Sequence, residues 1–153
     1  MGNRVRRAVV AVAAAAALLL GVAVWAQVKR PYRNGSVWDI AFIKVKPGMD
    51  VAYMNHLAGP WKAEQEAAKK EGLILSYKVL VTEAHGASDW NLLLMTEYKD
   101  LASMEAGQEK FDALAQKVIG DDQTQMQGYK DRLEIREVMG SRLAREIILE
   151  PKM

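Results

Sequence analysis

Two short stretches of the sequence combine residue types that take part in catalysis. The first, HGASDWN, places His85, Ser88 and Asp89 within a few positions of one another, and these are the residue types of a hydrolytic triad. Neighbours in a tight turn need not converge on one point, and no nucleophile-elbow motif accompanies them. Because turns collect Gly, Ser and Asp for backbone reasons, the simpler interpretation is an exposed turn between two strands.

The second stretch, DVAYMNHLAGPW, has helical periodicity and carries a histidine and a tyrosine. Tyr53, His56 and Pro60 lie on one flank at positions i, i+3 and i+7, and Trp61 lies on the adjoining apolar stripe. Histidine is the side chain best suited to act as a general base near neutral pH, and Tyr53 would orient the substrate. We therefore expect His56 and Tyr53 to be catalytic, partly exposed and of little weight for stability, and Trp61 to bind the ligand. The alternative is a structural or solvated histidine.

Two further residues are candidates for ligand contact. Trp90 stands at the start of an apolar strand, where it either packs or presents its indole N–H to a partner. Arg145 is in phase with apolar neighbours of the last strand, so it should point toward a buried face, where a guanidinium requires a carboxylate or a bound anion. The alternative for Arg145 is an internal ion pair with Glu134 or Glu97.

The first residues predict export. MGNRVRR is a basic start, and the apolar run AVVAVAAAAALLLGVAVWA follows it, which is the layout of a secretory signal peptide. Small residues two positions apart predict cleavage after Ala26, so the mature chain would begin at Gln27 in the periplasm or outside the cell. The alternative is an uncleaved anchor, since the run approaches the roughly 20 residues of a spanning helix. The membrane would then be contacted only through this leader.

Charge and composition exclude several classes of partner. Without residues 1–26 the chain keeps 18 of its 21 basic residues against 19 acidic ones, a formal charge of −1. A near-neutral domain without a basic stripe is unsuited to nucleic acid. The sequence contains no cysteine, which excludes disulfides, thiolate metal sites and a cysteine nucleophile. His56 and His85 match no metal-ligand spacing, so we expect neither a metal nor a cofactor.

A single domain is predicted over residues 37–151, preceded by a polar linker over 27–36. Its strands and helices alternate in the order βαββαβ, which is the ferredoxin-like arrangement of an antiparallel sheet with helices on one face. The expected elements are a strand over 37–46, a helix over 50–71 capped by Asp50 and interrupted at Gly59-Pro60, strands over 73–84 and 89–98 joined by HGAS, a helix from 99 with breaks at Gly107 and Gly120, a helix over 121–140, and a strand over 141–151.

The two central strands are apolar on both faces. Leu92 and Leu94 alternate with Leu93 and Met95 along one strand, and successive side chains of a strand point to opposite faces. The helices of one chain bury only one face of such a sheet. A second copy of the chain is the simplest cover for the other face, so we expect a homodimer that pairs sheet to sheet.

The sequence resembles the dimeric α+β barrel superfamily, and in detail its exported bacterial members. The similarity rests on FIKVKPGM, WKAEQEAAKKEGLILSYKVL, DWNLLLMTEYKDLASME and REVMGSRLAREI, and it covers residues 37–150. The resemblance implies a ferredoxin-like fold and a sheet-to-sheet dimer. The superfamily includes cofactor-free monooxygenases, haem-degrading enzymes, lactone isomerases and NIPSNAP-like proteins, and fold alone does not choose among them.

The haem-degrading branch is disfavoured by particular residues. Its members have an asparagine on the first strand, a tryptophan on the third and a histidine in the second helical region. Trp90 would serve as the tryptophan, but the first strand offers Asp39, and residues 99–139 contain no histidine.

The function that follows is an exported, homodimeric protein that binds an unidentified small molecule, with a cofactor-independent monooxygenase-like enzyme as its catalytic form. The alternative is a non-catalytic binding or structural homodimer of the periplasm. The sequence does not decide between an enzyme and a binding protein. A cleft that holds His56 and Tyr53 beside an apolar cavity would favour catalysis, whereas a cleft filled by Trp61 and Met54 would favour the alternative.

Overall fold

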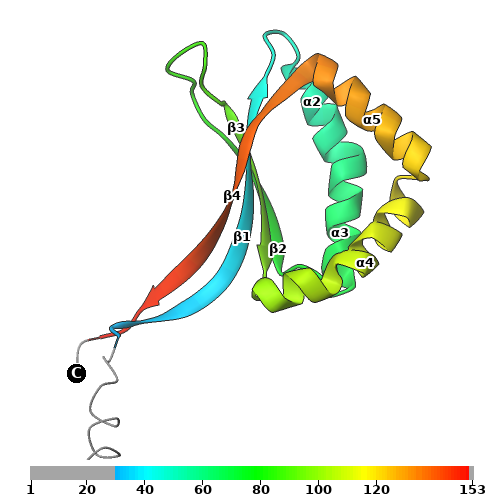
Figure 1. Ribbon diagram of the computed structural model, residues 1–153. Helices are drawn as coiled ribbons and strands as arrows, with labels where there is room; N and C mark the ends of the chain where they lie inside the picture. The colour runs from blue at the N-terminus through cyan, green and yellow to red at the C-terminus, as the bar shows by residue number, and fades with distance from the viewer. Residues whose placement is uncertain (1–29, 152–153) are drawn as a thin grey trace, which may run out of the picture. The chain divides into compact units, whose positions relative to one another are not determined.

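The computed structural model describes residues 30–151, and residues 34–148 of these form one compact unit built on a four-stranded sheet (Figure 1). The predicted leader over residues 1–26 lies outside the described residues. Within residues 30–151, no helix is long and apolar enough to span a membrane. The elements are β1 (Tyr32–Val45), α2 (Asp50–His56), η1 (Leu57–Trp61), α3 (Lys62–Lys70), β2 (Ser76–Val81), β3 (Leu92–Tyr98), α4 (Leu101–Val118), α5 (Asp122–Ile135) and β4 (Arg136–Leu149).

The sheet has the strand order β2-β3-β1-β4. β3 pairs antiparallel with both β2 and β1, in a register that sets Ile43 opposite Leu92 and Val79 opposite Leu94. Together with the chain order of strands and helices, this is the ferredoxin-like α+β fold, and the fold class expected from the sequence is confirmed.

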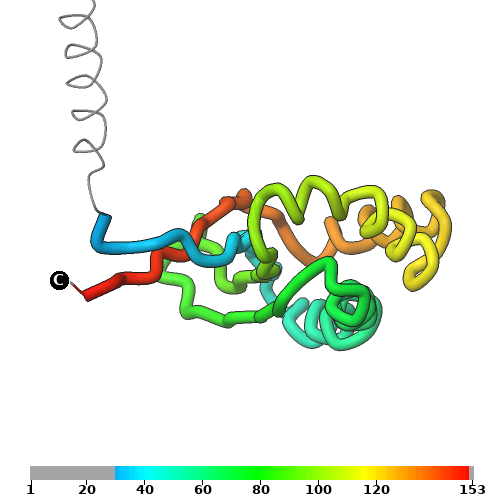
Figure 2. The backbone as a smooth tube through the Cα atoms, turned by 90° about the horizontal axis from the view of Figure 1, so that it is seen from below, coloured from blue at the N-terminus to red at the C-terminus, as the bar shows by residue number. Residues whose placement is uncertain are grey.

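The helices lie on one side of the sheet, as Figures 1 and 2 show. Between the two layers lies a core whose buried members come from β1, β3 and the first helical segment. They are Ile43, Val45, Tyr53, Leu57 and Leu92. Because successive side chains alternate across a strand, this core also identifies which residues of each strand face the helices.

The opposite face of the sheet, which we call the open face, is apolar at its centre. The register brings Phe42 beside Leu93 and Ile40 beside Met95 on this side. Leu80 of β2 joins them and is 46% exposed. No helix of the described chain covers this face (Figure 1), so the sheet keeps the two-sided apolar character that its sequence indicated.

Several boundaries differ from those expected. β1 begins at Tyr32, so part of the linker predicted over 27–36 is strand. The helix α2 has Met49 at its N-cap without a side-chain cap, so the prediction that Asp50 caps it is wrong. α4 runs unbroken through Gly107, so the break predicted there is wrong. This glycine lies against Leu73, and an added Cβ would sit 3.5 Å from Leu73 Cδ2.

The last helix is shorter than expected and the last strand longer. α5 ends at Ile135, whose carbonyl oxygen accepts a hydrogen bond from the backbone N–H of Lys46 at 3.0 Å. Gly140, expected to end the helix, lies inside β4 with a φ of 150°, a backbone angle that favours glycine. Pairing with the neighbouring strand therefore overrides the helical pattern of residues 136–140.

The described residues outside this unit form a second unit from both ends of the chain, residues 30–33 and 149–151. The backbone N–H of Glu150 donates to the carbonyl of Pro31 at 2.8 Å. The side chains of Arg33 and Glu150 form an exposed ion pair at 3.7 Å, which contributes little to stability.

Candidate functional site

The cluster His85, Ser88 and Asp89 forms the turn between β2 and β3. The backbone N–H of His85 donates to Asp89 Oδ2 at 3.0 Å, and the N–H of Asp89 donates to the carbonyl of Gly86 at 3.1 Å. His85 and Ser88 are exposed. The carboxylate therefore orders the turn, and the structure does not converge these side chains on a reacting atom.

Tyr53 and His56 are positioned by the turn that precedes α2. Gly48 adopts a φ of 78°, which glycine tolerates best, and the N–H of Met49 donates to the carbonyl of Lys46 at 3.0 Å. The helix that follows places residues three apart on one side. The two rings stack with centroids 6.0 Å apart at an interplanar angle of 20°, so they form one surface.

Trp61 is brought to the same site by a kink. Gly59 departs from helical geometry, with φ −96° and ψ −107°, and Pro60 follows it inside the wide turn η1. Proline has no amide hydrogen to continue the helical ladder, so the break expected at Gly59-Pro60 is observed. Beyond it Trp61 packs edge-on against Tyr77, with ring centroids 5.3 Å apart.

Two arginines enter from the junction of α5 and β4. Arg132 lies in the last turn of α5, and Arg136 is the first residue of β4. The guanidinium carbon of Arg136 lies 5.5 Å from the centroid of the Tyr53 ring, which is a cation–π distance. Among residues 30–151 the ion pairs are Arg33–Glu150 and Lys44–Glu137, so neither Arg132 nor Arg136 takes part in one.

These residues surround two adjoining cavities, which we call together the cleft. The sheet-side cavity has a volume of about 170 Å³, and the helix-side cavity about 370 Å³. His56, Ile119 and Arg132 line both. The sheet-side cavity is further lined by Tyr53, Trp61, Glu64, Leu94 and Arg136, and the helix-side cavity by Pro60, Thr124, Gly128, Asp131 and Ile135.

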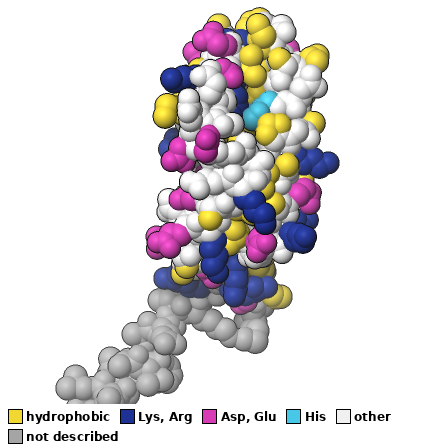
Figure 3. Space-filling view, turned by 90° about the vertical axis from the view of Figure 1, so that its right-hand side faces the viewer, with side chains coloured by type: hydrophobic (Ala, Val, Ile, Leu, Met, Phe, Trp, Pro, Cys, Tyr) yellow, Lys and Arg dark blue, Asp and Glu magenta, His cyan; other side chains and the backbone are white. Residues whose placement is uncertain are grey.

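The side of the molecule formed by the helices carries a solvent-accessible histidine side chain among apolar side chains (Figure 3). His56 itself is half-buried, whereas Tyr53 is 1% exposed. The expectation that both side chains are partly exposed is therefore correct for His56 and wrong for Tyr53, because the tyrosine ring belongs to the core beneath the cleft.

Burial and the arginines keep the imidazole of His56 neutral. The pKa of His56 is lowered to about 4, mainly by burial and in addition by the charges of Arg132 and Arg136. Burial likewise raises the pKa of Glu64, against the opposing charge of Arg132. The pKa of Tyr53 is raised by burial, with both arginines opposing. At neutral pH the cleft therefore presents an unprotonated imidazole beside two cationic guanidiniums.

The other two predicted ligand contacts lie elsewhere. Trp90 packs edge-on against Phe42 with centroids 5.1 Å apart, and Phe42 belongs to the open face. Arg145 is exposed. Neither residue lines the cleft. The ion pair suggested for Arg145 with Glu134 or Glu97 is absent from the described residues.

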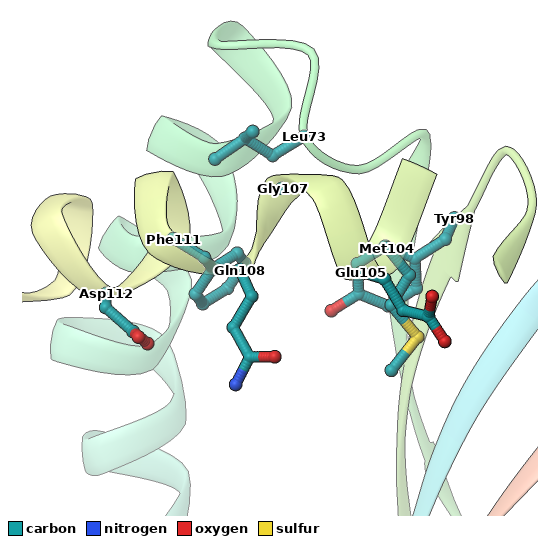
Figure 4. Close-up of a pocket in the computed structure, with 8 residues that line it drawn as sticks. All are labelled: Leu73, Tyr98, Met104, Glu105, Gly107, Gln108, Phe111 and Asp112. Carbon is teal, nitrogen blue, oxygen red and sulfur yellow. The ribbon is translucent and has the colours of Figure 1, made fainter. Parts of the chain in front are cut away.

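A third cavity, of about 250 Å³, lies beside α4 (Figure 4). Its lining contains no histidine, arginine or lysine, so it offers neither a base that is neutral at pH 7 nor a cation. In Figure 4, Leu73 faces the stretch of α4 around Gly107. The lining residues are Leu73, Tyr98, Met104, Glu105, Gly107, Gln108, Phe111 and Asp112.

No metal site is apparent in the described part of the chain, since no three histidine, aspartate or glutamate side chains are grouped to hold an ion. The cleft is suited instead to proton transfer and to the binding of negative charge. A neutral imidazole accepts a proton, and guanidinium groups stabilise an anion in a partly dry site.

Arg132, Glu64 and Ile119 were not expected in the site, and Arg136, which the sequence marks as a candidate together with Arg145, was not expected beside His56. The sequence carries a signal for the arginines, because Arg132 and Arg136 are four residues apart. That signal depends on knowing that α5 ends at Ile135, whereas the helix was predicted to reach Gly140.

The chain has a structural likeness among solved proteins. No family model matches the sequence, and no curated protein matches it. The chain is similar to a dimeric protein of unknown function with a ferredoxin-like fold from Bacteroides fragilis, with a TM-score of 0.41 and 17% identity. The match covers 75% of this chain and 97% of that one.

Proposed function

We propose that the protein is an exported homodimer that binds a small organic molecule in the cleft and uses His56 as a base, without a cofactor. The observation that carries this proposal is the sheet-side cavity, which holds His56 and Tyr53 beside the apolar side chains of Trp61 and Leu94. Of the two side chains expected to fill a non-catalytic cleft, Trp61 lines the sheet-side cavity, whereas Met54 is 38% exposed and does not line it.

The chemistry proposed for His56 is removal of a proton from the bound molecule. With its pKa lowered to about 4, the imidazole is unprotonated at neutral pH and free to accept a proton. A lowered pKa also makes it a weak base, so the proton must come from an acidic position of the substrate. Loss of a proton prepares a molecule for isomerisation or for reaction with molecular oxygen, the two kinds of chemistry that the resemblance implies.

Export is supported by the leader pattern of residues 1–26. A basic start, an alanine-rich apolar run and a small residue at Ala26 are the three parts of a secretory signal. The absence of cysteine fits a domain whose stability comes from packing in any redox environment.

Dimerisation through the open face is supported by its apolar centre and mixed rim. Phe42, Leu93 and Met95 supply the apolar centre. Glu97 is in phase with them on β3, and Lys78 on β2 lies opposite Met95 with its ammonium 4.9 Å from the Trp38 ring centroid. A patch that carries both signs of charge around an apolar centre suits a copy related by two-fold symmetry.

Replacing Phe42 with Asp tests the dimer. The charge would be buried in the interface, so light scattering should change from the mass of a dimer to that of a monomer. Val51 is 73% exposed on α2, so Val51→Asp introduces the same charge away from the open face and should leave the dimer intact. A folded wild-type monomer at micromolar concentration would contradict the sheet-to-sheet arrangement.

Native mass spectrometry of protein from the exported fraction tests the binding function. The expected result is the mass of two chains that begin at Gln27, together with a small molecule that is released on denaturation. Ile119→Trp should fill the cleft and remove this molecule, whereas Val51→Trp should retain it. Equal retention by both variants, or no retained molecule and no binding from a metabolite extract, would argue against the proposed cleft.

A further inference from the structure

The sheet-side cavity of the cleft contains more positive charge than its one carboxylate neutralises. Arg132 and Arg136 both line the sheet-side cavity, and Glu64 is the one carboxylate that lines it with them. Burial lowers the pKa of Arg132, and the neighbouring charge of Arg136 lowers it further. Two like charges that share a small cavity are stabilised when an anion enters between them.

Arg136 keeps a hydrogen-bond donor free for such an anion. Its Nε atom is buried and has no hydrogen-bond partner among the described residues. Buried polar groups of native proteins are almost always paired, so an unpaired guanidinium N–H on a residue that lines a cavity points to a ligand that accepts a hydrogen bond. The Nε–H and one terminal N–H of arginine together match the two oxygens of a carboxylate.

Apolar side chains supply another part of the cavity wall. Trp61 of η1, Leu94 of β3 and Ile119, which follows α4, line the same space as the arginines. Small-molecule sites generally combine apolar walls with a few polar groups that fix the orientation of the ligand. A free inorganic anion would leave these walls without a partner, whereas an anion on an apolar body would contact both sides.

We propose that the ligand of the cleft is a small organic acid, whose carboxylate is held by Arg136 and Arg132 and whose apolar body lies against Trp61, Leu94 and Ile119. This inference rests on the proposed binding function and names its ligand class. In this pose the apolar body of the acid also reaches His56, which lines the same cavity.

Binding should also change the protonation of the site. The charged and titratable groups that face His56 are Tyr53 on its own helix, Glu64 on α3, Asp131 and Arg132 on α5, and Arg136 on β4. A bound carboxylate offsets the arginine charges that help to lower the pKa of His56. The pKa of His56 should therefore rise on binding, which makes the imidazole a stronger base only when the acid is present.

Titration calorimetry with matched pairs of acids and amides tests the proposal. The probes are benzoate with benzamide, and 4-methylpentanoate with its primary amide, because each pair shares one apolar body and differs in charge. We expect at least one acid to bind about tenfold more tightly than its amide, a difference that corresponds to one charge-assisted pair. Arg136→Gln should remove this preference.

Arg142→Gln is the matched control, because Arg142 is an exposed arginine of β4 outside the cleft. It removes the same charge and should keep the preference for acids. The ¹⁵N–¹H resonance of Arg136 Nε in the wild-type protein gives a second measurement, which remains informative if Arg136→Gln does not fold. This resonance should shift when the acid binds and stay in place when the amide is added.

The outcomes separate the two proposals. If the amides bind as tightly as the acids, or if both arginine variants lose the acid equally, the cleft binds small molecules but not through a carboxylate, and this inference is wrong. If neither acids nor amides bind and native mass spectrometry finds no ligand, the binding function fails as well.

Discussion

The protonation of His56 gives a prediction that needs no knowledge of the ligand. Its pKa is about 4 in the folded protein and 6.5 in its ordinary state. Between these two pH values His56 binds a proton in the unfolded chain but not in the folded chain, so the free energy of unfolding falls as the pH falls. The contribution of His56 to the free energy of unfolding is constant above the pKa of the unfolded chain, and it is lost progressively as the pH falls to the pKa of the folded protein.

The size of the effect follows from the shift. At ~1.4 kcal/mol for each pKa unit the shift would correspond to about 3 kcal/mol. The imidazole is half-buried rather than fully buried, so solvent screening reduces the figure to about 1–2 kcal/mol. His56→Gln removes the titrating group, so the difference in the free energy of unfolding between variant and wild type should change in favour of the variant by this amount as the pH falls from above 6.5 to about 4.

Urea unfolding followed by circular dichroism, at one protein concentration and a series of pH values, measures the difference. Burial raises the pKa of Glu64, so protonation of Glu64 stabilises the folded protein as the pH falls. Glu64 is present in both proteins, so its contribution largely cancels in the comparison. His85→Gln, in the exposed turn, should follow the wild type throughout. A constant difference between wild type and His56→Gln across this range would refute the lowered pKa and the neutral base that depends on it.

Two further predictions concern positions that the fold makes sensitive. Tyr53→Ala should lower the free energy of unfolding by about 3–5 kcal/mol, because it deletes a buried aromatic ring. Tyr53→Phe should keep the ring packing and most of the stability. Near-equal urea midpoints for Tyr53→Ala and the wild type would show that the ring is not part of the core. Gly35→Ala should destabilise by about 1–3 kcal/mol through overpacking, since an added Cβ would lie 2.9 Å from Glu146 Cβ, whereas Gly86→Ala meets no atom within 4 Å and should be tolerated in thermal unfolding.

Much of the fold could be predicted from the sequence because its signals are local. Alternation of apolar residues gave β1, β2 and β3, and the Gly59-Pro60 pair predicted the kink that separates α2 from α3. Residues 136–140, which were predicted as helix, have a helical pattern that yields to pairing at the edge of the sheet. That pairing joins residues far apart in the chain, and local periodicity does not report it.

The candidate site, like the fold, could be predicted from the sequence only in part. The sequence by itself determined that Tyr53 and His56 share one side of the first helical segment, because helix geometry brings residues three apart together, and that Trp61 lies on the adjoining stripe. Only the tertiary structure decided that the partners of His56 are Arg132 and Arg136, about eighty residues later in the chain. The end of α5 contacts α2 in the folded chain. The physical consequence is a neutral imidazole beside two guanidiniums that form no ion pair within residues 30–151. It depends on burial and distance, which no stretch of sequence contains.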